Sequence, residues 1–432
     1  MKTLIKNATI YDSKNGLTGK NDILIESKQI LAVKKRIKNN NYQVIDAAGK
    51  IIIPALIDIH THLREPGYEA KETIKTGTEA AAAGGFSAVA AMPNTNPVAD
   101  KVTVIEQLKF KAQNSAVRVY PIGSITKASQ GKELSEIGSL AQAGVKALSD
   151  DGNPVMNSEI MRRAMEYASA FDLTIIDHCE DQNLSKNGVM DEGYYSTIFG
   201  LKGIPAAAEE IMVARDIILA EMTGCPLHIA HLSTAGSLNL VKAAKARGVK
   251  VSFEVTPHHL LLTAKAVENY DPKTKVHPPL RSKKDKDLLV EALKAGEIDV
   301  LATDHAPHTY EDKLGEFDYA AFGISGLETA LGLLHHHFIQ TGMINWDALL
   351  KMYYYTPGKI MGIEAEGLKQ GARADFIVFN PDREWIIEPQ KFKSKGKNTP
   401  FAGQKLIGKN EMTFVNGKLV YDDRGGKNEI FY

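Results

Sequence analysis

The chain has 432 residues, of which 44% are hydrophobic, and this suits one large domain with a substantial core plus an accessory domain. Its 52 Lys and Arg residues balance 52 Asp and Glu residues, so no excess positive charge favours nucleic acid or an anionic membrane as a partner. No apolar run approaches the length of a membrane span, and the start, MKTLIKNATIYDS, lacks the apolar core of a signal peptide. Because Cys179 and Cys225 are the only cysteines, a disulfide framework is excluded and we expect a cytoplasmic protein.

Both ends of the chain are predicted to form short β-strands. Apolar and polar residues alternate, with turn residues between them, in TLIKNATIYDS, DILIESKQILAVKK and QVIDAAGKII near the start, and in ADFIVFNPD and EMTFVNGKLVYD near the end. The Asn416-Gly417 pair in VNGK favours a two-residue hairpin turn of type I′. We expect the two ends to build one small β-sandwich domain together, from residues 1–52 and 366–432.

Between these ends, β-rich apolar runs alternate with helical stretches such as AAAEEIMVARDIILAEMTG. Such alternation predicts a parallel sheet with crossover helices. The candidate strands are LIDIHTH, FSAVAAM, VRVYPIG, VKALS, LTIIDH, PLHIAH, KVSFEV and IDVLAT. Eight such units predict an α/β fold, a (β/α)8 TIM-type barrel over residues 53–365, with its active site at the C-terminal ends of the strands.

Polar side chains gather where these strands end. They are His60 and His62 at the first strand, Asn94 at the second, Asp150 and Asp151 at the fourth, His178 at the fifth, His231 at the sixth, and Asp304 and His308 at the eighth. Imidazole and carboxylate groups bind Zn²⁺ or a similar borderline cation. Four histidines with several carboxylates suit two metals, which together polarise a carbonyl and activate water. The residues therefore predict metal-dependent hydrolysis, or cyclising condensation, at an amide-like carbon.

Several motifs resemble those of a known family. They are IDIHTHLREPG, KETIKTGTEAAAAGGFSAVAAMPNTNP, SDDGNPVM, DHCED, HLSTAGS, PPLR, ATDHAPH and GISGLETAL. Together they make the chain similar, over essentially its whole length, to the cyclic amidohydrolases of the amidohydrolase superfamily, and within these to the bacterial type I dihydroorotases. That family interconverts N-carbamoyl-L-aspartate and L-dihydroorotate plus water in pyrimidine (UMP) biosynthesis, so the resemblance implies a hydrolase that acts on a cyclic amide.

The resemblance also implies a role for each site residue. His60 and His62 would bind the first metal with Asp304 beside it, His178 and His231 would bind the second, and Asp151 would bridge them; one or two Zn²⁺ ions are expected, with two favoured. Asp304 would act as general base and acid toward a hydroxide that bridges the metals. Arg64, Asn94 and His308 would hold the substrate carboxylate, because the guanidinium fork suits that anion. Phe322 and Gly323 would contact the ring.

Two departures from the family pattern leave roles open. His277 precedes PPLR where the family usually has an Asn that touches substrate, so we expect His277 at the substrate, with an open effect on affinity or preference. Lys146 lies within GVKALSDDG. Hydantoinases, allantoinases and type II dihydroorotases use a strand-four lysine, carbamylated by CO₂, as the metal bridge. The bridge is therefore Asp151 or a carbamylated Lys146, and the SDDG motif favours Asp151.

Other functions and partners also remain open at this stage. An allantoinase or a dihydropyrimidinase-like amidase would share the metal site and bind another ring. A catalytically inactive relative, serving as a partner of aspartate transcarbamoylase, is disfavoured because all four histidines are present. The resemblance allows a homodimer or a complex with that transcarbamoylase. The polar segment 306–323 could be a lid over the substrate or a plain surface loop.

Overall fold

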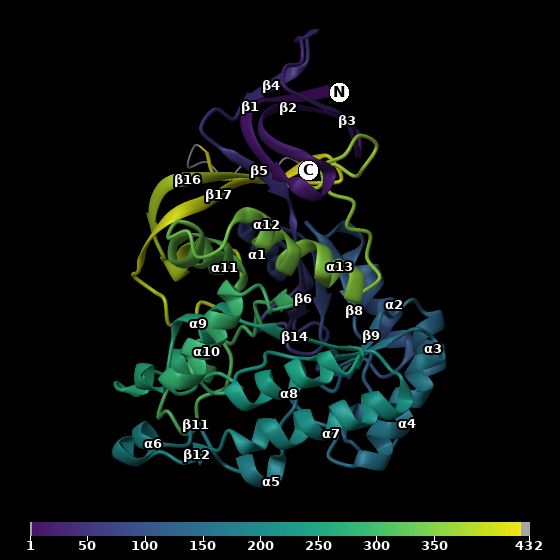
Figure 1. The fold of residues 1–432 in the computed structure, drawn as a ribbon, viewed down its shortest axis with the longest axis vertical. Helices are drawn as coiled ribbons and strands as arrows, with labels where there is room; N and C mark the ends of the chain where they lie inside the picture. Colours follow the sequence, from purple (N-terminus) through teal and green to yellow (C-terminus); the bar gives the residue numbers. More distant parts are fainter. Residues whose placement is uncertain (1, 425–432) are drawn as a thin grey trace.

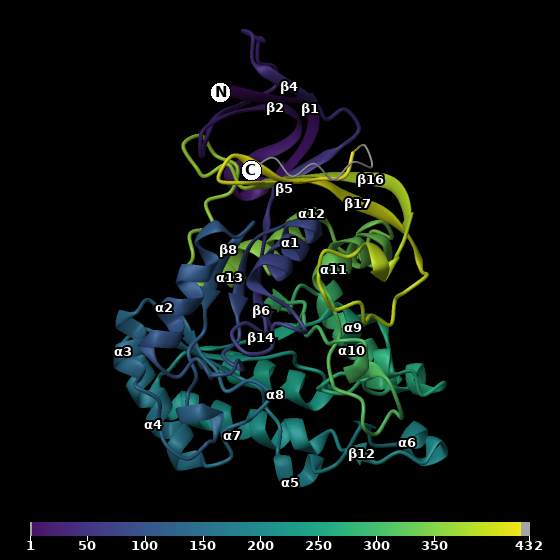
Figure 2. The ribbon, with the colours of Figure 1, turned by 180° about the vertical axis from the view of Figure 1, so that it is seen from behind.

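The computed structural model describes residues 2–424. Strands from both ends of the chain gather at one end of the molecule, and the remaining chain forms a larger body of strands and helices (Figure 1, Figure 2). In both views the purple N-terminal strands lie beside the yellow C-terminal strands. The expected mixed α/β architecture, with a β part built from both chain ends, is confirmed. Residues 425–432 of the predicted C-terminal segment, and residue 1, lie outside the described residues.

One sheet, here called the terminal sheet, contains the strands from both chain ends. Its strands are β1 (Lys2–Asp12), β2 (Leu17–Glu26), β3 (Gln29–Lys34), β4 (Gln43–Asp46), β5 (Ile51–Pro54), β16 (Phe376–Ile386), β17 (Lys405–Val415) and β18 (Lys418–Asp422). Their order is β18-β17-β16-β5-β1-β2-β3, and β4 pairs with β1 outside this path. Strand β5 joins the two chain ends, because it pairs in parallel with β1 and antiparallel with β16.

The turn between β17 and β18 is the one that the VNGK motif predicts. Asn416 has a φ of 50° and Gly417 a φ of 71°. A type I′ turn needs positive φ at both central residues, which Asn and Gly adopt more easily than other residues do. The local sequence therefore determines this hairpin.

All of the strands predicted for the middle of the chain are present. They are β6 (Leu56–Thr61), β7 (Phe86–Ala91), β8 (Arg118–Pro121), β9 (Ala147–Leu148), β10 (Thr174–Asp177), β13 (Leu227–Ile229), β14 (Val251–Val255) and β15 (Val300–Leu301). They form two parallel sheets, β6-β7-β8 and β15-β14-β13-β10-β9. Isolated parallel bridges join these sheets at both edges, one between Gly123 and Leu148 and the other between Thr61 and His305.

Helices follow these strands along the chain. The principal helices, one after each strand, are α1 (Ile74–Gly84), α2 (Val102–Lys111), α3 (Ile137–Gln142), α4 (Ser158–Ser169), α7 (Ala207–Thr223), α8 (Ala235–Ala246), α10 (Lys283–Lys294) and α11 (Leu327–Leu334). The connections hold α5 (Gln182–Ser185), α6 (Tyr194–Phe199), α9 (Pro257–Leu261), α12 (Trp346–Leu350), α13 (Thr356–Ile360) and the strand pair β11 (Met190–Asp191) and β12 (Gly203–Ile204). Within residues 2–424, no helix is both long and apolar enough to span a membrane.

Helix α1 shows how local sequence sets these boundaries. It begins after Thr73, whose side chain accepts a hydrogen bond from the Thr76 backbone N–H, and it ends at Gly85, which has a φ of 92°. Gly84 permits close packing between helices, because a Cβ there would lie 2.2 Å from the Leu327 carbonyl oxygen at the start of α11. The GG pair after AAAA therefore both stops the helix and lets α11 approach it.

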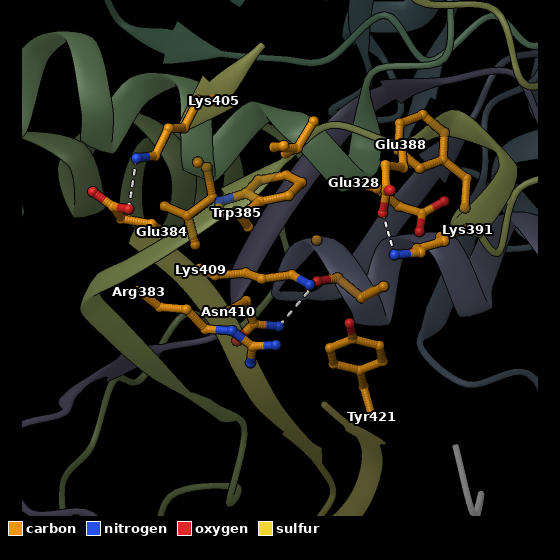
Figure 3. Close-up of a pocket in the computed structure, with 16 residues that line it drawn as sticks. Glu328, Arg383, Glu384, Trp385, Glu388, Lys391, Lys405, Lys409, Asn410 and Tyr421 are labelled. Carbon is orange, nitrogen blue, oxygen red and sulfur yellow. Dashed lines mark hydrogen bonds and ion pairs between the residues drawn. The ribbon is translucent and has the colours of Figure 1, made fainter. Parts of the chain in front are cut away.

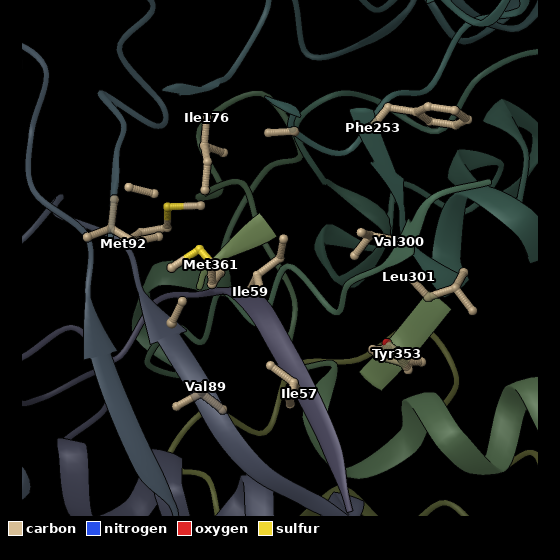
Figure 4. Close-up of a cluster of buried hydrophobic side chains, with 14 of the residues drawn as sticks. Ile57, Ile59, Val89, Met92, Ile176, Phe253, Val300, Leu301, Tyr353 and Met361 are labelled. Atoms are coloured by element: carbon tan, nitrogen blue, oxygen red, sulfur yellow. The ribbon is translucent and has the colours of Figure 1, made fainter. Parts of the chain in front are cut away.

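A continuous hydrophobic core lies among the parallel strands and the helices. Figure 4 shows part of it, where side chains from β6, β7, β10, β14 and β15 meet Tyr353 and Met361. Tyr353 is fully buried and packs edge to face on Phe86, with 5.5 Å between ring centroids. This packing holds the parallel strands in place, and the polar site residues lie at the ends of these strands.

Candidate metal centre and substrate pocket

The six side chains expected to bind metal come together at the C-terminal ends of the parallel strands. His60 lies in β6 and His62 just beyond it, and Asp151, His178, His231 and Asp304 follow β9, β10, β13 and β15. Each of the six is at most 6% exposed. Two triads share Asp151, one with His60 and His62 and the other with His178 and His231, and in each triad the potential ligand atoms lie within 4.8 Å of one another.

Asp151 stands between the two pairs of histidines. Its Oδ1 lies 3.4 Å from His60 Nε2, 3.7 Å from His178 Nδ1 and 3.5 Å from His231 Nε2, while its Oδ2 lies 3.4 Å from His62 Nε2. Donor atoms around one tetrahedral zinc ion are roughly 3.3 Å apart, since each lies about 2.0–2.1 Å from the metal. These separations suit ligands of cations that share Asp151.

Asp304 lies beside the first pair of histidines. Its Oδ1 is 3.2 Å from His62 Nε2 and 3.6 Å from His60 Nε2. Burial opposes ionisation of Asp304, but His62 and His60 lower its pKa to about 2. The side chain is therefore a carboxylate at neutral pH and can accept a proton next to these histidines.

The electrostatics of the cluster favour a cation. Burial alone would lower the pKa of His60, but Glu254 and Asp151 raise it well above its usual range. Burial would raise the pKa of Asp151, yet the surrounding imidazoles, His60 first, hold it well below its usual range. Burial lowers the pKa of His231. The carboxylates thus stabilise positive charge at the centre of the cluster, as the raised pKa of His60 shows.

Unpaired buried atoms provide a test of whether a metal fits this cluster. His60 Nε2 and Asp151 Oδ1, both of which face the centre, are buried and lack a hydrogen-bond partner among the described residues. Leaving a buried polar atom unpaired costs about 1–3 kcal/mol. Imidazole nitrogens and carboxylate oxygens are the ligands that Zn²⁺ and similar cations take in catalytic sites. The donor set therefore fits a divalent metal.

Glu254, in β14, is a site residue that the sequence analysis missed. It is fully buried, contacts His60 Nδ1, and accepts hydrogen bonds from His228 Nε2 at 3.1 Å and from the His231 backbone N–H at 3.1 Å. A carboxylate behind a metal-binding imidazole fixes its tautomer and orientation. An acidic residue inside the apolar run KVSFEV was the signal that could have revealed it.

Asn94 lies at the cluster, where it contacts one of the metal-binding candidates. Its Oδ1 is 2.9 Å from His62 Nδ1, so the amide oxygen accepts the ring N–H and leaves Nε2 facing Asp151 and Asp304. The sequence analysis expected Asn94 at the substrate carboxylate. The structure adds an orienting contact to His62, and only the amide nitrogen of Asn94 remains to serve a ligand.

Arg64, Lys71 and His308 lie beside the cluster and are here called the pocket, and the Asp312 carboxylate lies 3.3 Å from Lys71 Nζ. Arg64 Nη2 lies 3.4 Å from His308 Nε2, and Lys71 Nζ lies 3.4 Å from His308 Nδ1. Burial, followed by the charges of Arg64 and Lys71, lowers the pKa of His308 to about 3, so this imidazole is neutral. Strand β6 ends at Thr61, and Arg64 reaches the pocket from a left-handed backbone with a φ of 60° rather than from an extended strand. Lys71 was not identified from the sequence.

Phe322 and Gly323 lie against the same pocket. The His308 Nε2–H donates to the Phe322 carbonyl at 2.6 Å, and the Gly323 N–H donates to the Lys275 carbonyl at 2.9 Å. Lys313, inside the 306–323 segment, donates from its ammonium group to the carbonyls of Pro272, Lys275 and Ala321. The segment is therefore bonded to its surroundings at several points.

His277 lies beside the second pair of metal-binding candidates. Its ring centroid is 5.0 Å from that of His178 and 4.7 Å from that of Phe322, and its Nε2 pairs with the Glu180 carboxylate. Burial opposes ionisation of Glu180, but His277 lowers the pKa of that carboxyl to about 2. A side chain at this position thus sits between the metal cluster and the Phe322 loop.

The two candidates for the bridging ligand occupy very different environments. Asp151 is buried among the histidines, whereas Lys146 is exposed just before β9. Asp150 is held away from the centre, because its carboxylate accepts hydrogen bonds from the backbone of Ile125 and Thr126 at 2.8 and 3.1 Å. The geometry favours Asp151 over a carbamylated Lys146.

Backbone strain coincides with this site. Arg64, His231 and Asp304 have φ values of 60°, 30° and 46°. Such left-handed conformations cost non-glycine residues about 1–3 kcal/mol each, and in proteins they cluster at functional sites. Three residues of the candidate site therefore have strained backbone conformations, and this strain orients their side chains toward the site.

A separate cavity of about 490 Å³ lies between helices α1 and α11 and the terminal sheet. Figure 3 shows that charged side chains line it, with Lys405 paired to Glu384 and Lys391 to Glu388 around Trp385. None of the predicted site residues belongs to its lining. The predicted chemistry therefore does not concern this cavity.

Comparison with known proteins gives a consistent result. Residues 49–237 match the family model described as Dihydro-orotase-like. The chain is 52% identical to a dihydroorotase of Pelotomaculum thermopropionicum, over 98% of this chain and 99% of the relative. It is 49% identical to a dihydroorotase of Syntrophus aciditrophicus, over 98% of this chain and all of the relative.

Solved structures agree at the level of the fold. The L-hydantoinase (dihydropyrimidinase) of Arthrobacter aurescens superposes with a TM-score of 0.88 at 24% identity, covering 100% of this chain and 97% of that one. The dihydropyrimidinase of Brevibacillus agri superposes with a TM-score of 0.86 at 23% identity, covering 98% and 96%. Near-complete coverage at about 50% identity, together with the family match, shows that this chain belongs to the dihydroorotase family.

Proposed function

We propose that the protein is a metal-dependent dihydroorotase, which cyclises N-carbamoyl-L-aspartate to L-dihydroorotate and water and also runs the reverse reaction. The observation that carries this proposal is the position of the Arg64–His308 pocket directly beside the His/Asp cluster. An amide-activating centre next to a site for a carboxylate matches a substrate that holds both groups on one small ring. The relatives at about 50% identity support the same conclusion.

The metal site would hold zinc, and two ions are favoured over one. His60, His62 and Asp304 would surround the first ion, His178 and His231 the second, and Asp151 would bridge them. The two triads that share Asp151 support this division, because one contains His60 and His62 and the other contains His178 and His231. When bound, such ions polarise a carbonyl and lower the pKa of water.

Asp304 would move the proton in both directions. Ring closure joins the terminal ureido nitrogen to the carbon of the side-chain carboxylate, and one oxygen of that carboxylate leaves as water. Cyclisation takes up one proton overall, because a dianion becomes a monoanion. A carboxylate that faces the first histidine pair can deliver this proton during closure and receive it during ring opening.

Arg64 and the Asn94 amide nitrogen would donate to the carboxylate that remains on the ring, and His308 would lie against it. Lys71 adds positive charge at the same place. Phe322, Gly323 and His277 would border the ring itself, since they lie between this pocket and His178. The pocket therefore orients the substrate by its charge, so that the amide carbon is placed at the cluster.

The fold that supports this site would be a closed (β/α)8 barrel over residues 53–365, with a small β-sandwich domain from 1–52 and 366–432. The bridges that join the two parallel sheets at both edges support closure. We further propose a cytoplasmic location, which agrees with two cysteines that are buried and unpaired. A homodimer and a complex with aspartate transcarbamoylase are the expected assemblies, and light scattering with and without that enzyme distinguishes them.

Turnover by the purified protein tests the proposed function. L-Dihydroorotate, allantoin and dihydrouracil are each supplied with and without added Zn²⁺, and ring opening is followed by absorbance. Metal-dependent opening of L-dihydroorotate alone is the expected result. Activity only on allantoin or dihydrouracil would refute the assignment, and so would a protein that binds metal but opens none of these rings.

A further inference from the structure

The connector between β16 and β17, residues 387–404, leaves the terminal sheet and packs against loops at the candidate site. At one point Ser394 Oγ donates to the Glu72 carboxylate at 2.5 Å. Further along, Ser325 Oγ donates to the Gly396 carbonyl at 2.8 Å and the Ser325 N–H donates to the Asn398 carbonyl at 2.7 Å. The connector therefore joins a segment from the C-terminal part of the chain to the loops that follow β6 and β15.

The side chain of Asn398 lies at the centre of this contact. It is 5% exposed. Its Oδ1 accepts a hydrogen bond from the His308 backbone N–H at 3.1 Å, and its Nδ2 donates to the Gly323 carbonyl at 2.9 Å. The Asn398 amide thus links His308 to Gly323, which lies 15 residues further along the chain. Asn398 itself follows both by more than 70 residues.

These two segments are the ones proposed to touch substrate. His308 and the Phe322–Gly323 turn are also joined by the His308 Nε2–H bond to the Phe322 carbonyl. The turn packs closely on Ala306, because a Cβ on Gly323 would lie 2.7 Å from Ala306 Cβ and 2.8 Å from the Ala306 carbonyl oxygen. The backbone amide of His308, its side chain and the turn therefore form a closed ring of contacts completed by Asn398.

We propose that Asn398 is a positioning residue for the substrate pocket. Its amide sets the distance between His308 and Gly323, so a residue outside the predicted barrel determines how well the anionic ring is held. Asn398 acts through these two groups and does not touch the reacting atoms. The inference rests on the proposed function, because it assumes that His308 and Gly323 bind the ring.

Asn398→Asp is the sharpest test. The aspartate keeps an acceptor for the His308 N–H but places a second oxygen against the Gly323 carbonyl, where the amide donated. Asn398→Ala removes both bonds without adding charge and serves as the second variant if the aspartate form does not fold. The matched control is Asn410→Asp, since Asn410 is also buried and donates to the Ala82 and Ala83 carbonyls, away from the pocket.

Steady-state kinetics on L-dihydroorotate, bound zinc and thermal unfolding are measured for each variant and the wild type. We expect Asn398→Asp to raise KM about tenfold and Asn398→Ala to raise it less. The values of kcat and of bound zinc should change little, because the substitution weakens binding of the ground state and of the transition state equally. Asn410→Asp should lose thermal stability and keep its KM. An unchanged KM in both Asn398 variants, or an equal rise in Asn410→Asp, would overturn the inference. A wild-type chain that binds metal without turning over L-dihydroorotate would refute the proposed function, and this inference with it.

Discussion

Replacing Glu254 with glutamine tests how strongly the metal site depends on the carboxylate behind His60. Glu254 is fully buried and has three partners, namely His60 Nδ1, His228 Nε2 and the His231 backbone N–H. Partners of this kind typically contribute about 10–100-fold to metal affinity. Because each tenfold step is about 1.4 kcal/mol, the expected loss of binding free energy is about 1.4–2.8 kcal/mol.

Glutamine is a better choice than alanine for this test. Alanine would leave three buried donors without an acceptor, at about 1–3 kcal/mol each, which approaches the 5–15 kcal/mol that stabilises a typical folded chain. Glutamine keeps the volume and one acceptor oxygen while it removes the negative charge. Weaker metal binding in this variant can therefore be separated from unfolding.

The assay is competition for Zn²⁺ between the metal-free protein and a chromophoric chelator, with equilibrium dialysis to count bound ions. Glu328→Gln is the control, because Glu328 is a partly buried carboxylate that, within residues 2–424, accepts only from the Lys393 and Ser394 backbone N–H groups. We expect the control to bind zinc as the wild type does. Wild-type affinity in Glu254→Gln would refute the reasoning, and so would an equal loss in the control.

Four further predictions follow from the same geometry. Arg64→Lys should lower kcat/KM for L-dihydroorotate by about 10–100-fold with bound metal unchanged, since the planar fork is lost, and unchanged kinetics would remove Arg64 from the carboxylate pocket. Asp151→Asn should lose metal in elemental analysis while Lys146→Ala retains metal and activity; the opposite pattern would make a carbamylated lysine the bridge. Chelation should lower the temperature midpoint of unfolding, and added Zn²⁺ should restore it. A ligand that binds only the folded chain stabilises it by about 2.7 kcal/mol when the free ligand concentration is 100 times its Kd. A midpoint that chelation does not change would contradict a bound metal. Burial raises the pKa of Glu328 to about 7 from 4.5, so the folded state holds this proton more tightly and the wild type should lose stability relative to Glu328→Gln as pH rises from 4.5 to 7. That loss is at most about 3 kcal/mol, and equal differences in urea unfolding at pH 5 and pH 8 would refute it.

Much of the fold could be predicted from local sequence, because its signals depend on near neighbours. Apolar runs bounded by turn residues located all eight strands of the two larger parallel sheets, though not the short pair β11 and β12, since buried strands need little beyond their own composition to be recognised. The Asn416-Gly417 turn was predictable because its positive φ values are a local property. The His60/His62 pair and the other residues at strand ends could be placed at one edge, since parallel strands deliver their C-terminal ends to the same side.

Tertiary structure alone decided how these residues face one another. Glu254 lies behind His60 because β14 and β6 come close in space, and no short motif encodes that contact. The Asn94 oxygen turns to His62, and Lys146 is exposed while Asp151 is buried, because side-chain direction at a strand end depends on the neighbouring strands. Asn398 reaches His308 across 90 residues of chain. Alternation and turn chemistry act over a few residues, whereas a binding site is assembled by packing over the whole chain.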